Sequence, residues 1–185
     1  IDAGIARLEK MSEIAGDLGA TFDTLSSDGF EKASTQLYVL KDGLAFTSEG
    51  LQATNRLAMI SGESLGSFSE HIMASVDKIG KHFGMSTKVL GGDVGKALGN
   101  FKMLGKMTGD YVKEITKAAV FTRKLGIELS TLTGLVDKFD DFESGAEAAA
   151  QLAQGFGLVV DPLKMMGMEV GPRLAELQKG FIATG

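Results

Sequence analysis

The sequence contains no cysteine, only two prolines and only two histidines. Without cysteine the chain can form neither a disulfide scaffold nor a thiolate-bound zinc site. Because proline breaks helix interiors, its scarcity permits long helices. Catalysis needs convergent polar groups, and two histidines supply few of them.

Strand-like runs bounded by turn pairs such as Asn-Gly are also missing. Hydrophobic residues make up 44% of the 185 residues, so the chain is too apolar to be disordered. The 25 glycines then serve as helix ends or as close-contact points. These features predict an all-α chain, an array or bundle of about eight amphipathic helices with short glycine-containing connections.

The strongest helical pattern lies in residues 64–84, where apolar side chains recur every three or four positions. Ser64 is suited to the N-cap and Gly84 to a left-handed C-terminal position. The stripe consists of Leu65, Phe68, Ile72, Val76, Ile79 and Phe83.

Residues 86–109 carry the feature that we expect to matter for packing. Ser86 can cap a helix with apolar residues spaced four, three, four and three positions apart, which is a short heptad seam. The seam comprises Leu90, Val94, Ala97, Phe101 and Leu104, bordered by Gly91, Gly95 and Gly99. Because a lone helix cannot bury such a stripe, it should face another part of the chain or another copy.

Other segments show weaker helical signals. Residues 4–18 carry one apolar stripe, and residues 30–60 carry another that Gly43 and Gly50 weaken, so a break is possible there. Residues 109–125 should form a helix that closes at Gly126.

The remaining C-terminal helices are expected from their start signals. We expect Ser130 to open one helix, a Ser144-x-x-Glu147 capping box to open the next, and Asp161-Pro162 and Gly171-Pro172 to start the last two.

Charge falls into three blocks along the chain. Residues 1–77 carry net −7, residues 78–124 carry net +7 and residues 125–185 carry net −5. These blocks suggest three segments, an acidic one over 1–84, a basic glycine-rich one over 85–125 and an acidic one over 126–185, with one continuous structural unit as the alternative. We expect the basic block to contact acidic helices within the chain or between copies.

Candidate catalytic, metal and nucleotide sites are weak. His71 and His82 lie eleven residues apart, so on one helix they are about 16 Å apart and cannot share a metal ion. The Gly91–Ala97 stretch lacks the first glycine and the Ser/Thr of a phosphate-binding loop. We therefore expect no enzyme activity, no cofactor and no bound metal.

An acidic run follows the possible helix-turn-helix in residues 118–136. Asp137, Asp140, Asp141 and Glu143 do not match a calcium-binding loop and are interpreted as a solvated helix face. They would also repel phosphate, so sequence-specific nucleic-acid binding is not expected. The basic segment 86–109 could instead lie on a membrane, but packing in a bundle is favoured. No uncharged apolar run reaches 18 residues.

Several C-terminal stretches resemble tail tape-measure proteins of large tailed bacteriophages. They are residues 124–127, 137–143, 146–156, 161–162, 171–174 and 181–185, so the resemblance covers roughly residues 112–185. Ile1 and Gly185 look like cuts in a longer chain, and we expect a segment of such a protein.

The resemblance implies a structural virion protein that sets tail length, assists tail assembly and leaves with the genome on ejection. It implies synthesis in the host cytoplasm and a place in the tail interior or baseplate. The implied partners are other copies of the chain, tail-tube and baseplate hub proteins, and during ejection a host membrane. Two alternatives stay open: another internal or baseplate-associated helical virion protein, and a membrane-perturbing helical protein.

Overall fold

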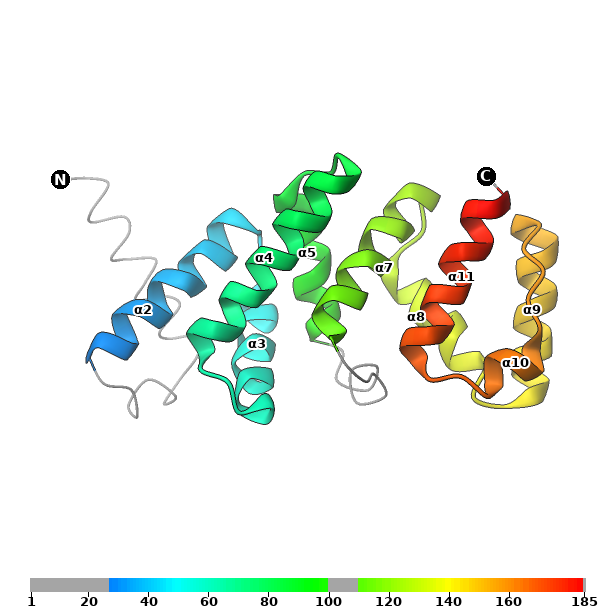
Figure 1. The fold of residues 1–185 in the computed structure, drawn as a ribbon, viewed down its shortest axis with the longest axis horizontal. Coiled ribbons are helices and arrows are strands. Elements are labelled where there is room, and N and C mark those ends of the chain that lie inside the picture. The colour runs from blue at the N-terminus through cyan, green and yellow to red at the C-terminus, as the bar shows by residue number, and fades with distance from the viewer. Residues whose placement is uncertain (1–26, 100–109, 185) are drawn as a thin grey trace. The chain divides into compact units, whose positions relative to one another are not determined.

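A computed structural model describes residues 27–99 and 110–184 of the chain (Figure 1). Within these residues the structure has nine α-helices, one short π-helix and no strand, which confirms the predicted all-α class. The chain divides into two compact units, residues 1–100 and residues 101–185. The predicted stripe over residues 4–18 lies outside the described residues, as do Phe101 and Leu104 of the seam.

The first unit contains four described α-helices and the π-helix. They are α2 (Ser27–Tyr38), η2 (Val39–Gly43), α3 (Ser48–Ser61), α4 (Leu65–Phe83) and α5 (Thr87–Leu98). Helix α5 packs on α3 and α4, while α2 also packs on α4. The core of this unit therefore lies among all four helices.

Helix α4 follows the prediction for residues 64–84 closely. The Ser64 hydroxyl accepts a hydrogen bond from the Ser67 backbone N–H at 3.1 Å, and Gly84 ends the helix with φ +65°. The stripe residues Phe68, Ile72 and Val76 are buried. Local capping signals and a strong apolar period thus agree with the tertiary packing.

A break within residues 30–60, which the sequence left open, is present between α2 and α3. The chain widens into the π-helix η2, then leaves helical geometry over residues 44–47 before Thr47 caps α3. Leu44 and Phe46 in this connection are buried, although Ala45 adopts φ +55°. The connection is therefore part of the core.

The second unit contains five described helices. They are α7 (Tyr111–Leu125), α8 (Leu129–Lys138), α9 (Phe142–Phe156), α10 (Pro162–Met166) and α11 (Val170–Thr184). Helix α11 packs on α7 and α8, and α9 packs on α8 and α10. Gly126 closes α7 with φ +70°, and Asp161 caps α10 ahead of Pro162, both as predicted.

Three helix starts differ from the predictions. The capping box at Ser144 and Glu147 is wrong, because Asp141 caps α9 by accepting a hydrogen bond from the Ser144 backbone N–H at 2.9 Å. Glu128 rather than Ser130 stands at the N-cap of α8, and α11 begins at Val170 instead of Gly171. In each case the helix starts one to three residues upstream of the predicted position.

Candidate functional site

The described part of the predicted seam forms the inner face of α5. Leu90, Val94 and Ala97 are buried, and the helices packed on α5 are α3 and α4 of the same unit. The first unit therefore covers this stretch of the seam with its own helices. Both have net charge zero with histidine neutral, since Glu49 balances Arg56 in α3, and Glu70 and Asp77 balance Lys78 and Lys81 in α4. The contact of the basic block with acidic helices stays a prediction. Ser86 occupies the N-cap position as expected, but its side chain makes no capping hydrogen bond.

Two of the three seam glycines allow close backbone contact. A Cβ atom added to Gly91 would lie 2.6 Å from the Leu44 carbonyl oxygen, and one added to Gly95 would lie 3.0 Å from the Phe46 ring. Across the helix pair, a Cβ on Gly50 of α3 would lie 3.0 Å from the Gly95 carbonyl oxygen. Gly99 is exposed and stands at the C-cap of α5. Gly91 and Gly95 therefore allow close contact with the connection before α3 and with the first turn of α3. They do not form a strip against one neighbouring helix.

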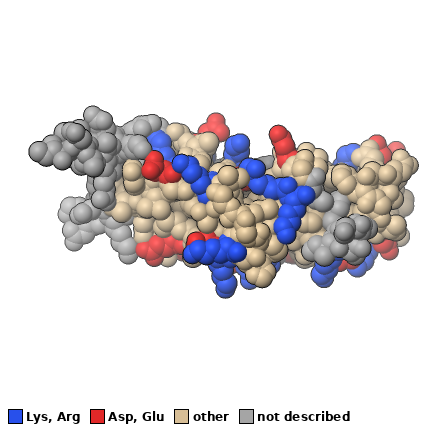
Figure 2. All heavy atoms as spheres, turned by 90° about the horizontal axis from the view of Figure 1, so that it is seen from above, with Lys and Arg blue, Asp and Glu red and all other residues tan. Residues whose placement is uncertain are grey.

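The lysines of α5 lie on its outer side. Lys88 and Lys96 are exposed, opposite the buried Leu90 and Val94. Figure 2 shows basic side chains interspersed with acidic side chains and with uncharged surface. The charge blocks do not coincide with the compact units, because the basic block of residues 78–124 extends across the boundary at residue 100.

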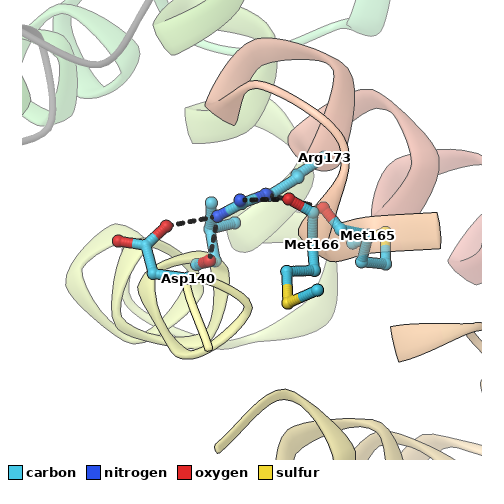
Figure 3. A network of polar contacts seen from close by, with 5 residues as sticks. Asp140, Met165, Met166 and Arg173 are labelled. Carbon is cyan, nitrogen blue, oxygen red and sulfur yellow. Dashed lines mark hydrogen bonds and ion pairs between the residues drawn. The ribbon is translucent and has the colours of Figure 1, made fainter. Parts of the chain in front are cut away.

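Arg173 is the centre of a polar network in the second unit (Figure 3). Its side chain is only 7% exposed, and its Nε donates to the Met165 carbonyl oxygen at 2.8 Å. One terminal nitrogen donates to the Val136 carbonyl oxygen at 3.2 Å and to Asp140 Oδ1 at 2.7 Å. The other donates to the Met166 carbonyl oxygen at 3.2 Å. The guanidinium group thereby joins the C-terminal ends of α8 and α10 to the start of α11.

The role of Arg173 was not predicted from the sequence, although a signal was present. Arg173 lies in the first turn of a helix, where the helix dipole disfavours a cation. Its neighbours Val170, Leu174 and Leu177 are apolar and buried. A cation at that place requires acceptors from elsewhere, and the last carbonyl groups of two helices together with a carboxylate meet that requirement.

The residues of the acidic run do not share one role, since two of them act structurally and Glu143 lies on the exposed surface. Asp140 forms the ion pair with Arg173, and Asp141 caps α9. Hydrogen bonds from the Ser144 backbone N–H and from its hydroxyl lower the pKa of Asp141 below its ordinary value. Glu143 is exposed, as predicted, and Asp137 is half-buried. Two of the four carboxylates therefore fasten helices.

The two histidines lie on α4 and do not converge with other candidate groups. His71 stands edge-to-face to Phe68, with ring centroids 6.5 Å apart, and His82 stands edge-to-face to Phe83 at 4.7 Å. Among residues 27–99 and 110–184, no three His, Asp or Glu side chains are placed to hold one metal ion. None of the helices in these ranges has both the length and the apolar character to cross a bilayer.

A shallow groove of about 500 Å³ lies between α11 and the segment that leads into α10. Its polar lining includes Lys164 and Glu176, whose Nζ and Oε1 atoms are 2.5 Å apart. The hydrogen bond from Lys164, together with its charge, lowers the pKa of Glu176. Lys164 and Glu176 are therefore paired with each other, and Asp161, which also lines the groove, caps α10.

Comparison of the chain with protein-family models, with curated proteins and with solved structures gives no match.

Proposed function

We propose that the chain is a non-catalytic structural segment of a tailed-phage virion, belonging to a tail tape-measure protein. The observation that carries the proposal is that polar side chains of the second unit cap its helices or connect them. Arg173, Asp140 and Asp141 lie in the acidic run and the C-terminal stretches that resemble tape-measure proteins, and each of them fastens or caps a helix. The resemblance over residues 112–185 also falls wholly within one compact unit, residues 101–185.

The helices constrain which role such a segment can have. The longest described helix has 19 residues, which corresponds to about 28 Å along its axis. Helices that fold back on one another do not add their lengths. We therefore propose that the two units are folded parts of a tape-measure protein, next to tail-tube or baseplate hub proteins, and that an extended region of the same protein measures the tail.

The same compactness favours a second candidate, an internal or baseplate-associated helical virion protein. Both candidates place the chain in the virion and in contact with other copies or other tail proteins. They differ in whether the chain leaves the particle together with the genome.

A membrane-perturbing role for residues 86–109 has less support. The apolar side chains Leu90 and Val94 are fully buried against the chain's own helices. Helix α5 would have to leave the first unit before it could insert them into a bilayer, and it would then expose the core that it now covers.

The test is to compare intact and emptied particles of the phage that encodes the chain. Purified virions are split into two samples, one of which is triggered to eject its genome. The chain is then quantified in both samples by mass spectrometry against the tail-tube protein. A tape-measure segment should be present in intact virions and strongly depleted in emptied ones.

Other outcomes separate the alternatives. Retention in emptied particles at the original ratio would favour the baseplate-associated protein. Absence from intact particles would refute both virion assignments. The major capsid protein provides the control, since its ratio to the tube protein should not change on ejection.

A further inference from the structure

Helix α2 is held to the other helices of the first unit chiefly through α4 (Figure 1). Helices α3, α4 and α5 each pack on the other two, whereas α2 packs on α4 and continues into η2. If α2 left the unit, the contacts among α3, α4 and α5 would therefore stay in place. Helix α2 is the element of this unit that can detach most easily.

The contact between α2 and α4 is incomplete in its polar groups. Gln36 of α2 donates a hydrogen bond to Glu70 of α4, and a Cβ atom on Gly66 would lie 2.6 Å from Gln36 Oε1. Ser69 lies on the same face of α4 as Gly66, three residues further on. Within the described residues, the buried Gln36 Oε1 and Ser69 Oγ atoms have no hydrogen-bond partner. Because water can satisfy both atoms once they are exposed, they lower the free-energy cost of separating α2 from α4.

The connection between α2 and α3 adopts an unfavourable local conformation. The chain widens into the π-helix η2, and Ala45 is the one non-glycine residue of the described ranges with a positive φ, +55°. Alanine disfavours this conformation because its Cβ atom lies too close to the following carbonyl oxygen. The buried Leu44 and Phe46 lie against Gly91 and Gly95 of α5. Packing on α5 therefore imposes the bend against the local preference of the backbone.

The sequence across this connection is compatible with one uninterrupted helix. Residues 27–61 contain no proline. Apolar residues and threonines recur at alternating spacings of four and three positions from α2 into α3, and they are Ala33, Leu37, Leu40, Leu44, Thr47, Leu51, Thr54 and Ala58. This spacing is the register of a continuous amphipathic helix. If residues 39–47 straightened, α2, η2 and α3 would form one helix about 50 Å long.

A straightened chain cannot keep both α2 and α3 on its own α4. Both helices pack on α4, and the chain changes direction between them (Figure 1). Straightening therefore carries α2 away from the α4 of its own chain. The apolar face of α2 and the surface that it leaves on α4 must then be covered by matching surfaces of another molecule.

We infer that α2 is exchanged between two copies of this chain. Residues 39–47 straighten, and α2 of each copy packs on α4 of the other. The partner is a second copy because its α4 presents the same surface to which α2 already binds, including the hydrogen bond from Gln36 to Glu70. The inference goes beyond the proposed function, because it concerns how two copies of the chain associate.

Opposing changes set the balance between the bent monomer and the exchanged dimer. Straightening returns Ala45 to the right-handed conformation and adds helical hydrogen bonds across the connection. It also withdraws Leu44 and Phe46 from α5, which exposes apolar surface. Joining two copies further reduces translational and rotational freedom. We therefore expect monomers in dilute solution and exchanged dimers when the chain folds at high concentration.

A substitution at Thr47 should favour the exchanged dimer. Thr47 caps α3 only in the bent form, where its hydroxyl accepts a hydrogen bond from the Gly50 backbone N–H at 3.2 Å. Thr47→Ala removes this cap and favours a continuous helix. The association constant should therefore rise about tenfold for each connection, or about a hundredfold for the dimer.

Ser64→Ala is the matched control. Ser64 caps α4 in the same way, by accepting a hydrogen bond from the Ser67 backbone N–H at 3.1 Å. This cap is present in both the bent and the straightened form, so its loss should leave the dimer fraction at the parent value. An equal rise in both variants would mean that dimers result from general destabilisation, which would overturn the inference.

Ala45→Gly should have the opposite effect on association. Glycine accepts the left-handed conformation of the bent form and weakens a continuous helix. The association constant should therefore fall at least about a hundredfold. Dimerisation at the parent level in Ala45→Gly would show that the connection does not straighten.

The association of all variants is measured after folding at two concentrations. The full 185-residue chain is unfolded in urea, refolded at micromolar and at roughly millimolar concentration, and analysed by size-exclusion chromatography with light scattering. Because α2 must detach before it can exchange, dimers should persist for a time after dilution. Circular dichroism verifies that each variant is folded. A Thr47→Ala chain that stays monomeric at the higher concentration would overturn the inference.

A crosslink distinguishes exchange of α2 from any other mode of dimerisation. The natural chain contains no cysteine, so Gln36→Cys and Glu70→Cys, introduced together into Thr47→Ala, provide the only reactive thiols. A short bifunctional maleimide should join them within one chain in the monomer. In the exchanged dimer it should join two chains, which a denaturing gel separates by mass. Dimers whose crosslinks remain within single chains would overturn the exchange.

Discussion

Inside each unit some helices and connections approach one another closely, and the two units stabilise these internal contacts by different means. In the first unit, glycines let backbone approach backbone, as at Gly50 with Gly95 and at Gly91 with Leu44. In the second unit, a buried guanidinium group occupies the space between helix ends. Where a Cβ atom on a glycine of the second unit would lie within 3.4 Å of a neighbour, the nearest atom belongs to a side chain, such as the Leu158 methyl group beside Gly180.

This difference predicts different sensitivities to mutation. A backbone contact cannot move aside without shifting a helix, so the first unit should be intolerant of added volume. A polar network depends on complete hydrogen bonding, so the second unit should be intolerant of a lost donor.

The largest effect is expected from Arg173→Met in the second unit. The substitution leaves the carbonyl groups of Val136, Met165 and Met166 without their donor, and it should lower the free energy of unfolding by about 3 kcal/mol. Hydrogen exchange followed by mass spectrometry should show faster exchange in α8, α10 and α11, with the first unit unchanged.

Arg173→Lys is the matched control, since it keeps the charge but cannot reach all four acceptors at once. Its destabilisation should be intermediate. A loss smaller than about 1 kcal/mol in the methionine variant would mean that apolar packing, and not the guanidinium network, stabilises this unit.

The next effect is expected from Gly91→Ala in the first unit. The added methyl group would lie 2.6 Å from both the Leu44 carbonyl oxygen and the Leu44 Cβ atom, and should cost about 2 kcal/mol through overpacking. Faster hydrogen exchange should be confined to α3, α4 and α5.

Gly92→Ala is the control on the adjacent residue of the same helix. Its Cβ atom would meet the Ala45 carbonyl oxygen at an ordinary 3.6 Å, so the substitution should be neutral or stabilise α5 by up to about 1 kcal/mol. If Gly91→Ala and Gly92→Ala change the free energy of unfolding by the same amount, close backbone contact is not what makes the first unit sensitive to added volume.

A smaller change of opposite sign is expected from Gly134→Ala in the second unit. Gly134 is exposed within α8, and a Cβ atom there would meet nothing within 4 Å. Alanine should therefore raise the free energy of unfolding by about 0.5–1 kcal/mol through helix propensity alone. Urea unfolding monitored by circular dichroism measures the change, and a destabilised variant would show that this glycine also serves packing.

The smallest effect concerns the pH dependence that Asp141 adds to the second unit. Because its folded-state pKa lies below the ordinary value of 3.8, its stabilisation is present above pH 3.8 and is lost as pH falls through the folded pKa. Asp141→Asn keeps an N-cap acceptor but does not titrate. Thermal unfolding should show a parent that loses stability more steeply than the variant below about pH 4, and parallel curves would contradict the assignment.

The accuracy of the sequence predictions varied with the range of the interactions concerned. The ends of α4 at Ser64 and Gly84, the end of α7 at Gly126 and the start of α10 at Asp161 were all predicted. The capping box at Ser144 failed because Asp141 competes for the same backbone N–H, three residues upstream, and Phe142 then joins the helix. Two locally acceptable caps cannot be ranked without the packing around them.

The candidate site was predicted only in part. Heptad spacing identified Leu90, Val94 and Ala97 as a buried seam, and their burial is observed. The spacing could not show which part of the chain covers the seam. The spacing also gave no reason to pair Arg173 with Asp140, although Asp140 belongs to the acidic run and Arg173 follows the predicted Gly171-Pro172 helix start.

The helical class of this protein and several of its helix ends follow from the amino-acid sequence. Apolar period, capping side chains and left-handed glycines all act within a few residues, so they can be recognised in a linear chain. The contacts of Gly91 with Leu44, and of Arg173 with Asp140 33 residues away, are visible in the folded chain alone. Such contacts depend on how whole helices pack, and many pairings of similar apolar stripes are compatible with the same local pattern.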